Sequence, residues 1–171
     1  MTATPVHEIV TARLRLRRAV PDDLAALHEI MADAETMRFW STPPHTELET
    51  TRAWLAGMIA APRETSDDFI IERNGRLIGK LGAWRLPEVG FLISRQHWGQ
   101  GYAGEALQAF IGYALPHRTD HLTADVDPRN ERSLALLARA GFYETGRAEN
   151  TFRVGDAWCD SVYLRLDACG A

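Results

Sequence analysis

Three glycines, Gly99, Gly101 and Gly104, lie directly in front of a stretch that is typical of an amphipathic helix, within HWGQGYAGEA (97–106). Because glycine has no Cβ, the backbone N–H groups of such a loop can come close to the oxygens of a phosphate. The helix that begins near Tyr102 adds the positive end of its dipole at the same point. Residues 96–104 therefore predict an anion-binding loop.

The glycine spacing also matches the dinucleotide fingerprint G-x-G-x-x-G, but its surroundings do not. A Rossmann loop follows the end of a parallel strand in a βαβ unit. Here residues 94–98 separate Ile93 from Gly99, and the preceding strand-like run closes a hairpin meander. Asp125 lies at about the right spacing for a ribose contact, yet too little chain follows Gly104 for the second half of that fold. No G-x-x-x-x-G-K-[ST] is present, which excludes a Walker P-loop.

Hydrophobic periodicity predicts the elements that position this loop. Asn74-Gly75 between two strand-like runs is a strong hairpin signal. The first half of the chain is expected to form a strand in 13–18, a helix from Pro21, a helix over about 47–60, and three strands at 68–73, 76–84 and 88–93. The second half is expected to form a helix at 102–115 that ends before Pro116, a strand at 121–126, and a helix that follows the turn at 127–130 and ends at Ala140. Two further strands are expected around Gly155-Asp156. The order β-α-α-β-β-β-α-β-α-β-β indicates an α/β domain on a mixed sheet.

Composition limits the function classes. The chain has 171 residues, 46% hydrophobic and 25% charged, and a formal net charge of −4, which gives no reason to expect nucleic acid or an anionic membrane as partner. Cys159 and Cys169 lie in no C-x-x-C or Cys/His cluster, so we expect no structural zinc. We found no signal-peptide pattern and no apolar run of membrane-spanning length, and we expect a cytoplasmic protein.

At this point the motifs resemble a known family, the GNAT N-acetyltransferases. Q-x-x-G-x-G, after a β-meander and before an amphipathic helix, resembles their acyl-CoA signature, and N-x-x-S with a terminal G-F follows at the family's usual distance. The opening TARLRLR and the closing GDAWCDSVYLRL are similar to the Rim-type ribosomal-protein N-terminal acetyltransferases. The residues that carry the two motifs are Gln96, Gly99 and Gly101, then Asn130, Ser133, Gly141 and Phe142. The resemblance covers essentially the whole chain.

The resemblance implies a single acyl-CoA N-acyltransferase domain over residues 1–171, with a mixed, mostly antiparallel sheet flanked by helices. It implies acetyl-CoA as cosubstrate and no metal, with pantetheine in a gap where two strands splay apart. A backbone N–H in the run Phe91, Leu92 and Ile93, expected at Leu92, would then polarise the thioester carbonyl. The cofactor-binding residues implied are Phe91, Leu92, Ile93, Gln96, Trp98, Gly99, Gln100, Gly101, Tyr102, Ala103, Gly104, Asn130 and Ser133.

Asn130 and Ser133 are three residues apart on the first turn of a helix, and hence on one face. By resemblance Asn130 would bind a pantetheine amide and Ser133 would lie near the sulfur, although Asn130 is also a sufficient helix N-cap. Many family members carry a Tyr four residues further on, as the acid that protonates the departing thiolate. Here that residue is Leu137, which leaves Ser133, Tyr143 or water as the acid, and we favour Ser133.

The base is the second catalytic role. Glu88 begins a strand in P-E-V-G-F, which is similar to the family sequence whose Glu serves as a base through water. A plain surface carboxylate is the alternative for Glu88, and Glu72 is a second candidate. An α-amine with a pKa near 8 loses its proton at a cost under ~1 kcal/mol, against about 4 kcal/mol for a lysine. A site without strongly marked acid and base therefore suits an amine of low pKa.

Aromatic loop residues are expected to frame the acceptor site, namely Phe39, Trp40 and His45, with the final hairpin near 150–152. The sequence thus predicts acetyl transfer from acetyl-CoA directly to a primary amine, on a small molecule or a protein N-terminus. The alternative from another class is a noncatalytic acyl-CoA-binding sensor or scaffold. We expect a monomer or homodimer, with no nucleic acid and no membrane as partner.

Overall fold

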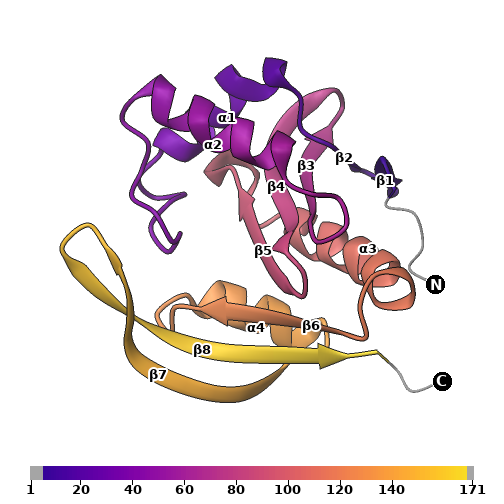
Figure 1. The fold of residues 1–171 in the computed structure, drawn as a ribbon, viewed down its shortest axis with the longest axis vertical. Helices are drawn as coiled ribbons and strands as arrows, with labels where there is room; N and C mark the ends of the chain where they lie inside the picture. Colours follow the sequence, from indigo (N-terminus) through magenta and orange to yellow (C-terminus); the bar gives the residue numbers. More distant parts are fainter. Residues whose placement is uncertain (1–5, 169–171) are drawn as a thin grey trace.

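The computed structural model describes residues 6–168, and Figure 1 shows them as one curved sheet with helices packed against it. The strands are β1 (Glu8–Val10), β2 (Arg15–Arg17), β3 (Asp67–Arg73), β4 (Arg76–Arg85), β5 (Glu88–Ile93), β6 (His121–Val126), β7 (Tyr143–Val154) and β8 (Ala157–Asp167). The helices are α1 (Leu24–Ala32), α2 (Leu48–Ala60), α3 (Tyr102–His117) and α4 (Glu131–Arg139), with 3₁₀ turns at Pro21–Asp23 and Arg95–His97. The strand order is β1-β2-β3-β4-β5-β6-β8-β7.

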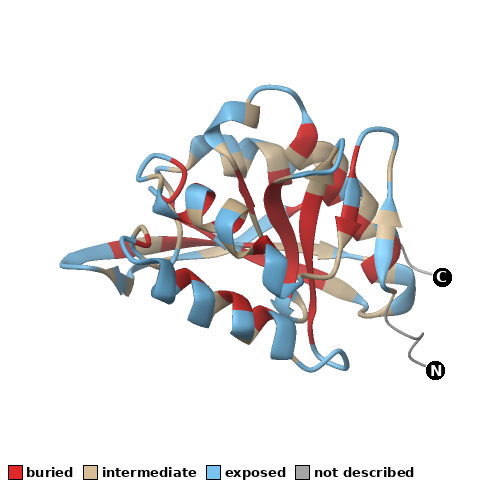
Figure 2. Cartoon of the chain, turned by 90° about the horizontal axis from the view of Figure 1, so that it is seen from above, coloured by how far each residue is buried: buried red, intermediate tan, exposed pale blue. Residues whose placement is uncertain are grey.

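The core has two parts because successive side chains of a strand point to opposite faces of the sheet. Leu92 of β5 packs with α1 and α2 on one face, whereas its neighbour Ile93 belongs to the larger cluster with α3. Figure 2 shows the same arrangement, with buried residues concentrated in the central strands between exposed helical surfaces. Side chains of β5 are therefore packed on both faces of the sheet, and this packing holds the β5 backbone in place along the site.

β5 and β6 are neighbours that pair at one point only. All other neighbouring strands are antiparallel, whereas β5 and β6 are parallel and their register contains the single pair Glu88–Thr123. Thr123 N–H donates to the Pro87 carbonyl at 3.0 Å, and beyond this point the strands diverge. Figure 1 shows β6, β8 and β7 running across the direction of β3–β5. The splay expected from the resemblance is present.

The predicted elements are confirmed, with three differences. A short strand, β1, precedes the predicted ones and pairs with β2; its three residues are too few to show a period. The strand expected over 13–18 narrows to Arg15–Arg17. The helix expected to end before Pro116 continues through His117, and Arg118 N–H still donates to the Ala114 carbonyl at 2.7 Å. Pro116 has no N–H to donate to the carbonyl of Gly112, and both residues are exposed to solvent in this last part of the helix.

Candidate active site

The divergence of β5 and β6 opens a cleft of about 1810 Å³. Its walls come from the α1–α2 loop, α2, strands β3 to β6, the glycine loop, α4 and the β7–β8 hairpin. Each segment that the sequence predicted to take part in binding or catalysis contributes residues to this cleft. The individual side chains that do not line it are named below. The cleft is therefore the candidate active site.

The glycine loop lies at one end of the cleft, where α3 begins. Gly99 and Gly101 have φ of +72° and +81°, in the left-handed region that favours glycine, and Gly101 is the N-cap of α3. No atom lies within 4 Å of where a Cβ would stand on Gly99 or Gly104, so the space above the loop is open. Gln96 and Gln100 do not line the cleft; the Gln100 side chain donates to the Gln96 carbonyl at 3.3 Å instead. The remaining predicted residues from Trp98 to Gly104 do line it.

Trp98 fixes the loop to the end of β5. Its indole N–H donates to the Ile93 carbonyl at 2.7 Å. The Arg132 guanidinium of α4 lies 5.2 Å from the Trp98 ring centroid, a cation–π contact that connects the two sides of the cleft. Trp98 therefore lines the cleft and also connects the glycine loop to β5 and to α4.

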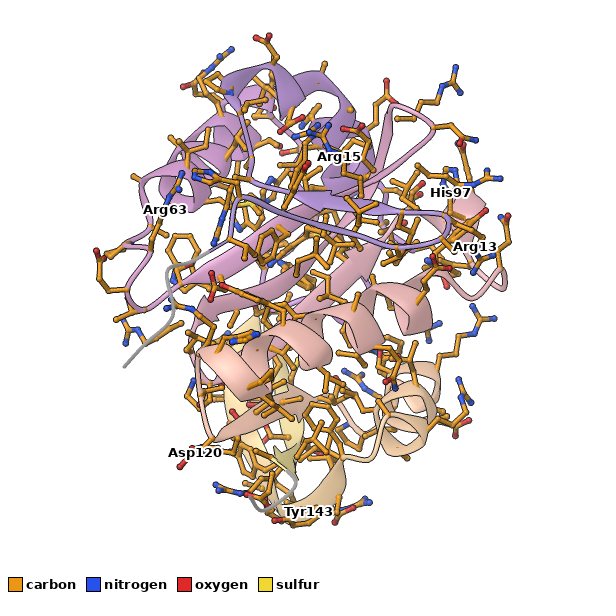
Figure 3. The ribbon with its side chains drawn as sticks, turned by 90° about the vertical axis from the view of Figure 1, so that its right-hand side faces the viewer. Arg13, Arg15, Arg63, His97, Asp120 and Tyr143 are labelled. Atoms are coloured by element: carbon orange, nitrogen blue, oxygen red, sulfur yellow. The ribbon has the colours of Figure 1, made fainter. Side chains whose placement is uncertain are left out.

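Arg13 supports the loop from behind, and sequence reasoning missed it. Its side chain donates to the Gln100 carbonyl at 3.0 Å and to Glu105 at 2.6 Å, and its guanidinium lies 4.5 Å from the Tyr102 ring centroid. Figure 3 shows Arg13 and His97 at the same end of α3. The alternating arginines and leucines of residues 13–18 did not indicate this contact, because the contact joins segments that are far apart in the chain.

The backbone of Phe91, Leu92 and Ile93 lines the cleft along its length. Ser94 N–H donates to Ile78 of β4, and Leu92 stands opposite Lys80. Because backbone N–H groups alternate between the two edges of a strand, the Leu92 N–H points toward β4, while those of Phe91 and Ile93 point toward the diverging β6. The expectation that Leu92 supplies the free donor is therefore corrected to Phe91 or Ile93.

Glu88 lines the cleft where β5 and β6 meet. Desolvation by the surrounding walls raises the pKa of this carboxyl above its usual range, and the negative charge of Asp125 raises it further. Neither carboxylate forms an ion pair within residues 6–168. Glu72 differs: it is ion-paired with Arg17 at 2.6 Å and lies outside the cleft, which removes it as a candidate base on position.

Asn130 and Ser133 both line the cleft from the first turn of α4. The Asn130 side chain accepts a hydrogen bond from the Ser133 N–H at 3.3 Å, so Asn130 is the N-cap of α4. Leu137 is fully buried, one turn along the same helix.

Tyr143 is placed wrongly for an acid in the cleft. Its hydroxyl donates to Asp167 at 2.6 Å, and the residue does not line the cleft. Figure 3 shows Tyr143 near Asp120 and away from His97. Tyr163 of β8, directly opposite Asp125 in the β6–β8 register, lines the cleft, as does Tyr102 of the glycine loop. Sequence reasoning missed Tyr163 because strand pairing brings it there.

The acceptor end of the cleft contains two of the three predicted aromatic-loop residues. Phe39 and Trp40 line it, and so do Thr151 and Phe152 from the hairpin. His45 does not: it is buried, and its Nδ1 lies 2.9 Å from the Thr51 hydroxyl. Burial, and then the nearby His28, lower the pKa of His45, which keeps it neutral as a packed residue.

The same end holds residues that the sequence did not single out. Trp54 of α2, Trp84 of β4 and the buried pair Lys80–Asp68 all line the cleft. The Lys80 ammonium lies 2.7 Å from the Asp68 carboxylate. An alternating polar side chain in β4 was the only sequence signal for Lys80, and such alternation is common on solvated strands.

Residues 6–168 show neither a metal site nor a membrane-spanning helix. No group of His, Cys, Asp and Glu among them has the arrangement of a metal site, and Cys169 lies outside this range. None of the helices in the same range is both long and apolar enough to cross a membrane.

Comparison with known proteins identifies the family. Residues 13–143 match the family model of the acetyltransferase (GNAT) domain. An uncharacterized N-acetyltransferase of Bacillus licheniformis is 26% identical over 151 residues, covering 82% of this chain and 85% of the relative. A ribosomal-protein-alanine N-acetyltransferase of Escherichia coli is 35% identical over 88 residues, covering 50% of this chain and 44% of the relative.

Solved structures share the fold. The ribosomal-protein α-N-acetyltransferase RimL, solved with coenzyme A, superposes with a TM-score of 0.82 at 21% identity, covering 94% of this chain and 97% of that one. A GNAT-family acetyltransferase from Bacillus anthracis superposes with a TM-score of 0.81 at 23% identity, covering 94% and 98%. The family match, the splayed strands and the glycine loop agree, and the chain belongs to the GNAT family of acetyltransferases.

Proposed function

We propose that the protein transfers an acetyl group from acetyl-CoA directly to a primary amine, with both substrates bound in the cleft at once. The observation that carries this proposal is the arrangement along β5. Phosphate-binding geometry at Gly99–Gly104 and a carboxylate of raised pKa at Glu88 stand at opposite ends of one open strand edge. An extended thioester cofactor would bring its acyl group toward Glu88 when its pyrophosphate lies on the loop.

The residues present fit coenzyme A. Backbone amides of the loop and the N-terminus of α3 suit the pyrophosphate, and the space where a Cβ of Gly99 or Gly104 would stand is open. The free edge of β5 offers the Phe91 and Ile93 amides to an extended chain that carries amide groups. One of these N–H groups would stabilise the negative charge that develops on the thioester oxygen.

Glu88 is proposed as the base, acting through water. A raised pKa makes a carboxylate a better proton acceptor near neutral pH. The amine nitrogen loses a proton toward Glu88 and forms a bond to the acetyl carbon, and the carbon–sulfur bond breaks. Ser133, on the first turn of α4, would donate a hydrogen bond to the departing sulfur and relay to it a proton from water, so that the serine hydroxyl is protonated again at the end of the step.

The proposed acceptor is an amine of low pKa, such as a protein N-terminal α-amine or a small α-amine. Two of the relatives are named for acting on ribosomal proteins. A thiol-release assay at pH 7.5 with acetyl-CoA tests the proposal, using short peptides, small α-amines and α-blocked lysine. We expect turnover with α-amines to exceed that with the blocked lysine by at least about tenfold, because deprotonating the lysine costs about 4 kcal/mol.

Leu137 is the observation that favours the second candidate, a noncatalytic acyl-CoA-binding module, because it stands where many family members carry the acid. The same assay separates the two functions when it is combined with calorimetric titration of acetyl-CoA. Tight binding with no thiol release on any amine would support the module. Preferred turnover of blocked lysine would instead contradict the low-pKa acceptor.

A further inference from the structure

Three tryptophans from three different elements line the acceptor end of the cleft. Trp40 comes from the α1–α2 loop, Trp54 from α2 and Trp84 from the end of β4. Trp84 is 50% exposed although it lies in the wall of the cleft. A side chain this large and apolar is usually more buried. We call these three residues and the two glycines described next the indole pocket.

Gly57 of α2 and Gly90 of β5 allow two of the indole rings to pack directly against the backbone of the walls. A Cβ on Gly57 would stand 3.3 Å from the tip of the Trp84 ring, and a Cβ on Gly90 would stand 3.8 Å from the tip of the Trp40 ring. Gly90 is two residues after Glu88, so the two residues lie on the same face of β5. The Trp40 ring, which packs over Gly90, therefore lies on the face of β5 that carries the proposed base.

The position for a cation between two of these rings is already filled. The Lys80 ammonium lies 5.5 Å from the Trp40 ring centroid and 5.7 Å from that of Trp54. Lys80 is only 3% exposed and is held by Asp68. A second cation entering here would be repelled by a fixed ammonium, whereas an uncharged ring would meet indole surface and no like charge. This favours an aromatic group over a second positive charge.

We propose that the indole pocket holds an aromatic ring carried by the acceptor amine, close to the amino group itself. The inference rests on the proposed function, and names the substrate class: an α-amine with an aromatic side chain. Aromatic rings gain from area burial and from edge or offset contacts with other rings. A methyl group in the same place would bury far less surface.

Three amides of similar amine basicity test this inference: L-phenylalaninamide, L-alaninamide and L-lysinamide. Their kcat/KM values come from thiol release, and their dissociation constants from titration of the CoA-loaded protein. We expect phenylalaninamide to exceed alaninamide by at least tenfold in both measurements, and lysinamide to gain no such advantage. Trp84→Ala should reduce the tenfold preference to about twofold.

Trp158→Ala is the matched control, because Trp158 is an equally exposed tryptophan, 56%, that does not line the cleft. It should keep the full preference. Gly57→Leu puts a side chain where the tip of the Trp84 ring lies and so displaces that ring, and it should also abolish the preference. Unchanged affinity for acetyl-CoA in each variant shows that the fold is retained.

The outcomes separate the two proposals. Selective binding of phenylalaninamide without turnover would disprove the proposed function and support the pocket. Equal binding of the three amides, or none, would overturn the pocket, even if turnover occurs. A preference for lysinamide would overturn it in favour of a cation site, and an unchanged preference in both pocket variants would place the ring elsewhere.

Discussion

The two ends of the cleft are built from different parts of the chain. The cofactor end uses backbone: two glycines in left-handed conformations, the N-terminus of α3 and the open edge of β5. The acceptor end uses side chains, with indoles, a buried Lys80–Asp68 pair and the carboxylates of Glu88 and Asp125. In the proposed function, backbone geometry would bind the cofactor, whereas side chains would decide the chemistry and the choice of acceptor.

The two ends also differ in charge. Arg132 and Arg139 line the cleft from α4 on the side of the glycine loop, where a cofactor with phosphates would lie. Glu88 and Asp125 line the opposite part and have no ion-pair partner within residues 6–168. The glycine loop therefore suits an anion and the immediate surroundings of Glu88 suit an ammonium group, while Arg38 and Arg129 lie beside Phe39 in the same acceptor end. The predictions below disturb one end at a time.

The largest effect is expected from Glu88→Gln at the acceptor end. Glutamine keeps the shape of the side chain but cannot accept the proton, so kcat should fall about 100-fold. Calorimetric titration should show almost unchanged affinity for acetyl-CoA, because the glycine loop is untouched. Glu72→Gln is the control outside the cleft. Full activity of Glu88→Gln across the pH profile would make Glu88 a structural residue.

At the cofactor end, Gly101→Val should weaken acetyl-CoA binding at least tenfold, or about 1.4 kcal/mol. A β-branched residue is disfavoured at a φ of +81°, and its side chain would stand close to the Arg13 guanidinium that supports the loop. Calorimetric titration measures the dissociation constant.

Gly155→Val separates backbone strain from the loss of the phosphate site. Gly155 also has a positive φ, +58°, but it lies in the β7–β8 turn, outside the cleft. It should lose stability in thermal unfolding and keep its affinity for acetyl-CoA. Unchanged affinity in Gly101→Val would rule out this loop as the pyrophosphate site.

The same contrast between the ends explains what could be predicted from the sequence. The glycine loop is local, because the glycines and the helix start lie within nine residues of continuous chain, 96–104. Trp54, Trp84, Lys80 and Tyr163 come together only through strand register and the packing of α2. Their residue types did not indicate a site, because a tryptophan, lysine or tyrosine in a helix or strand is usually an ordinary core or surface residue.

The corrections have the same cause. The choice between the Leu92 amide and those of Phe91 and Ile93 depends on which edge of β5 faces β4, and only the register fixes that. His45 was predicted from an aromatic loop that does reach the cleft, but its own side chain turns inward to Thr51. Sequence patterns placed the elements correctly and could not orient single groups on them.

Ser133→Ala tests the region between the two ends, and a smaller effect is expected there. A thiolate with a pKa near 8 to 9 needs little help to leave at neutral pH, so kcat should fall by less than about tenfold. Tyr163→Phe is the informative companion, because Tyr163 lines the cleft opposite Asp125, away from the glycine loop that carries Tyr102. A loss in Tyr163→Phe alone would move the acid to β8, and no loss in either variant would leave the proton to water.

The smallest expected effect is that of Asp125→Asn on the pH profile. The negative charge of Asp125 favours protonated Glu88, and so contributes to the raised pKa of that carboxyl. Removing the charge should lower the pKa of Glu88 and move the acid limb of the activity to lower pH, by less than about one unit for a solvent-accessible pair.

The acceptor amine titrates as well, and the measurement must separate the two protons. With an α-amine acceptor, log kcat/KM should rise with a slope of one below the pKa of the amine and a slope of two below that of Glu88. The breakpoint between these slopes should move to lower pH in Asp125→Asn. It should stay in place in Asp22→Asn, an exposed carboxylate outside the cleft. A breakpoint that does not move in Asp125→Asn would mean that the group titrating there is not Glu88.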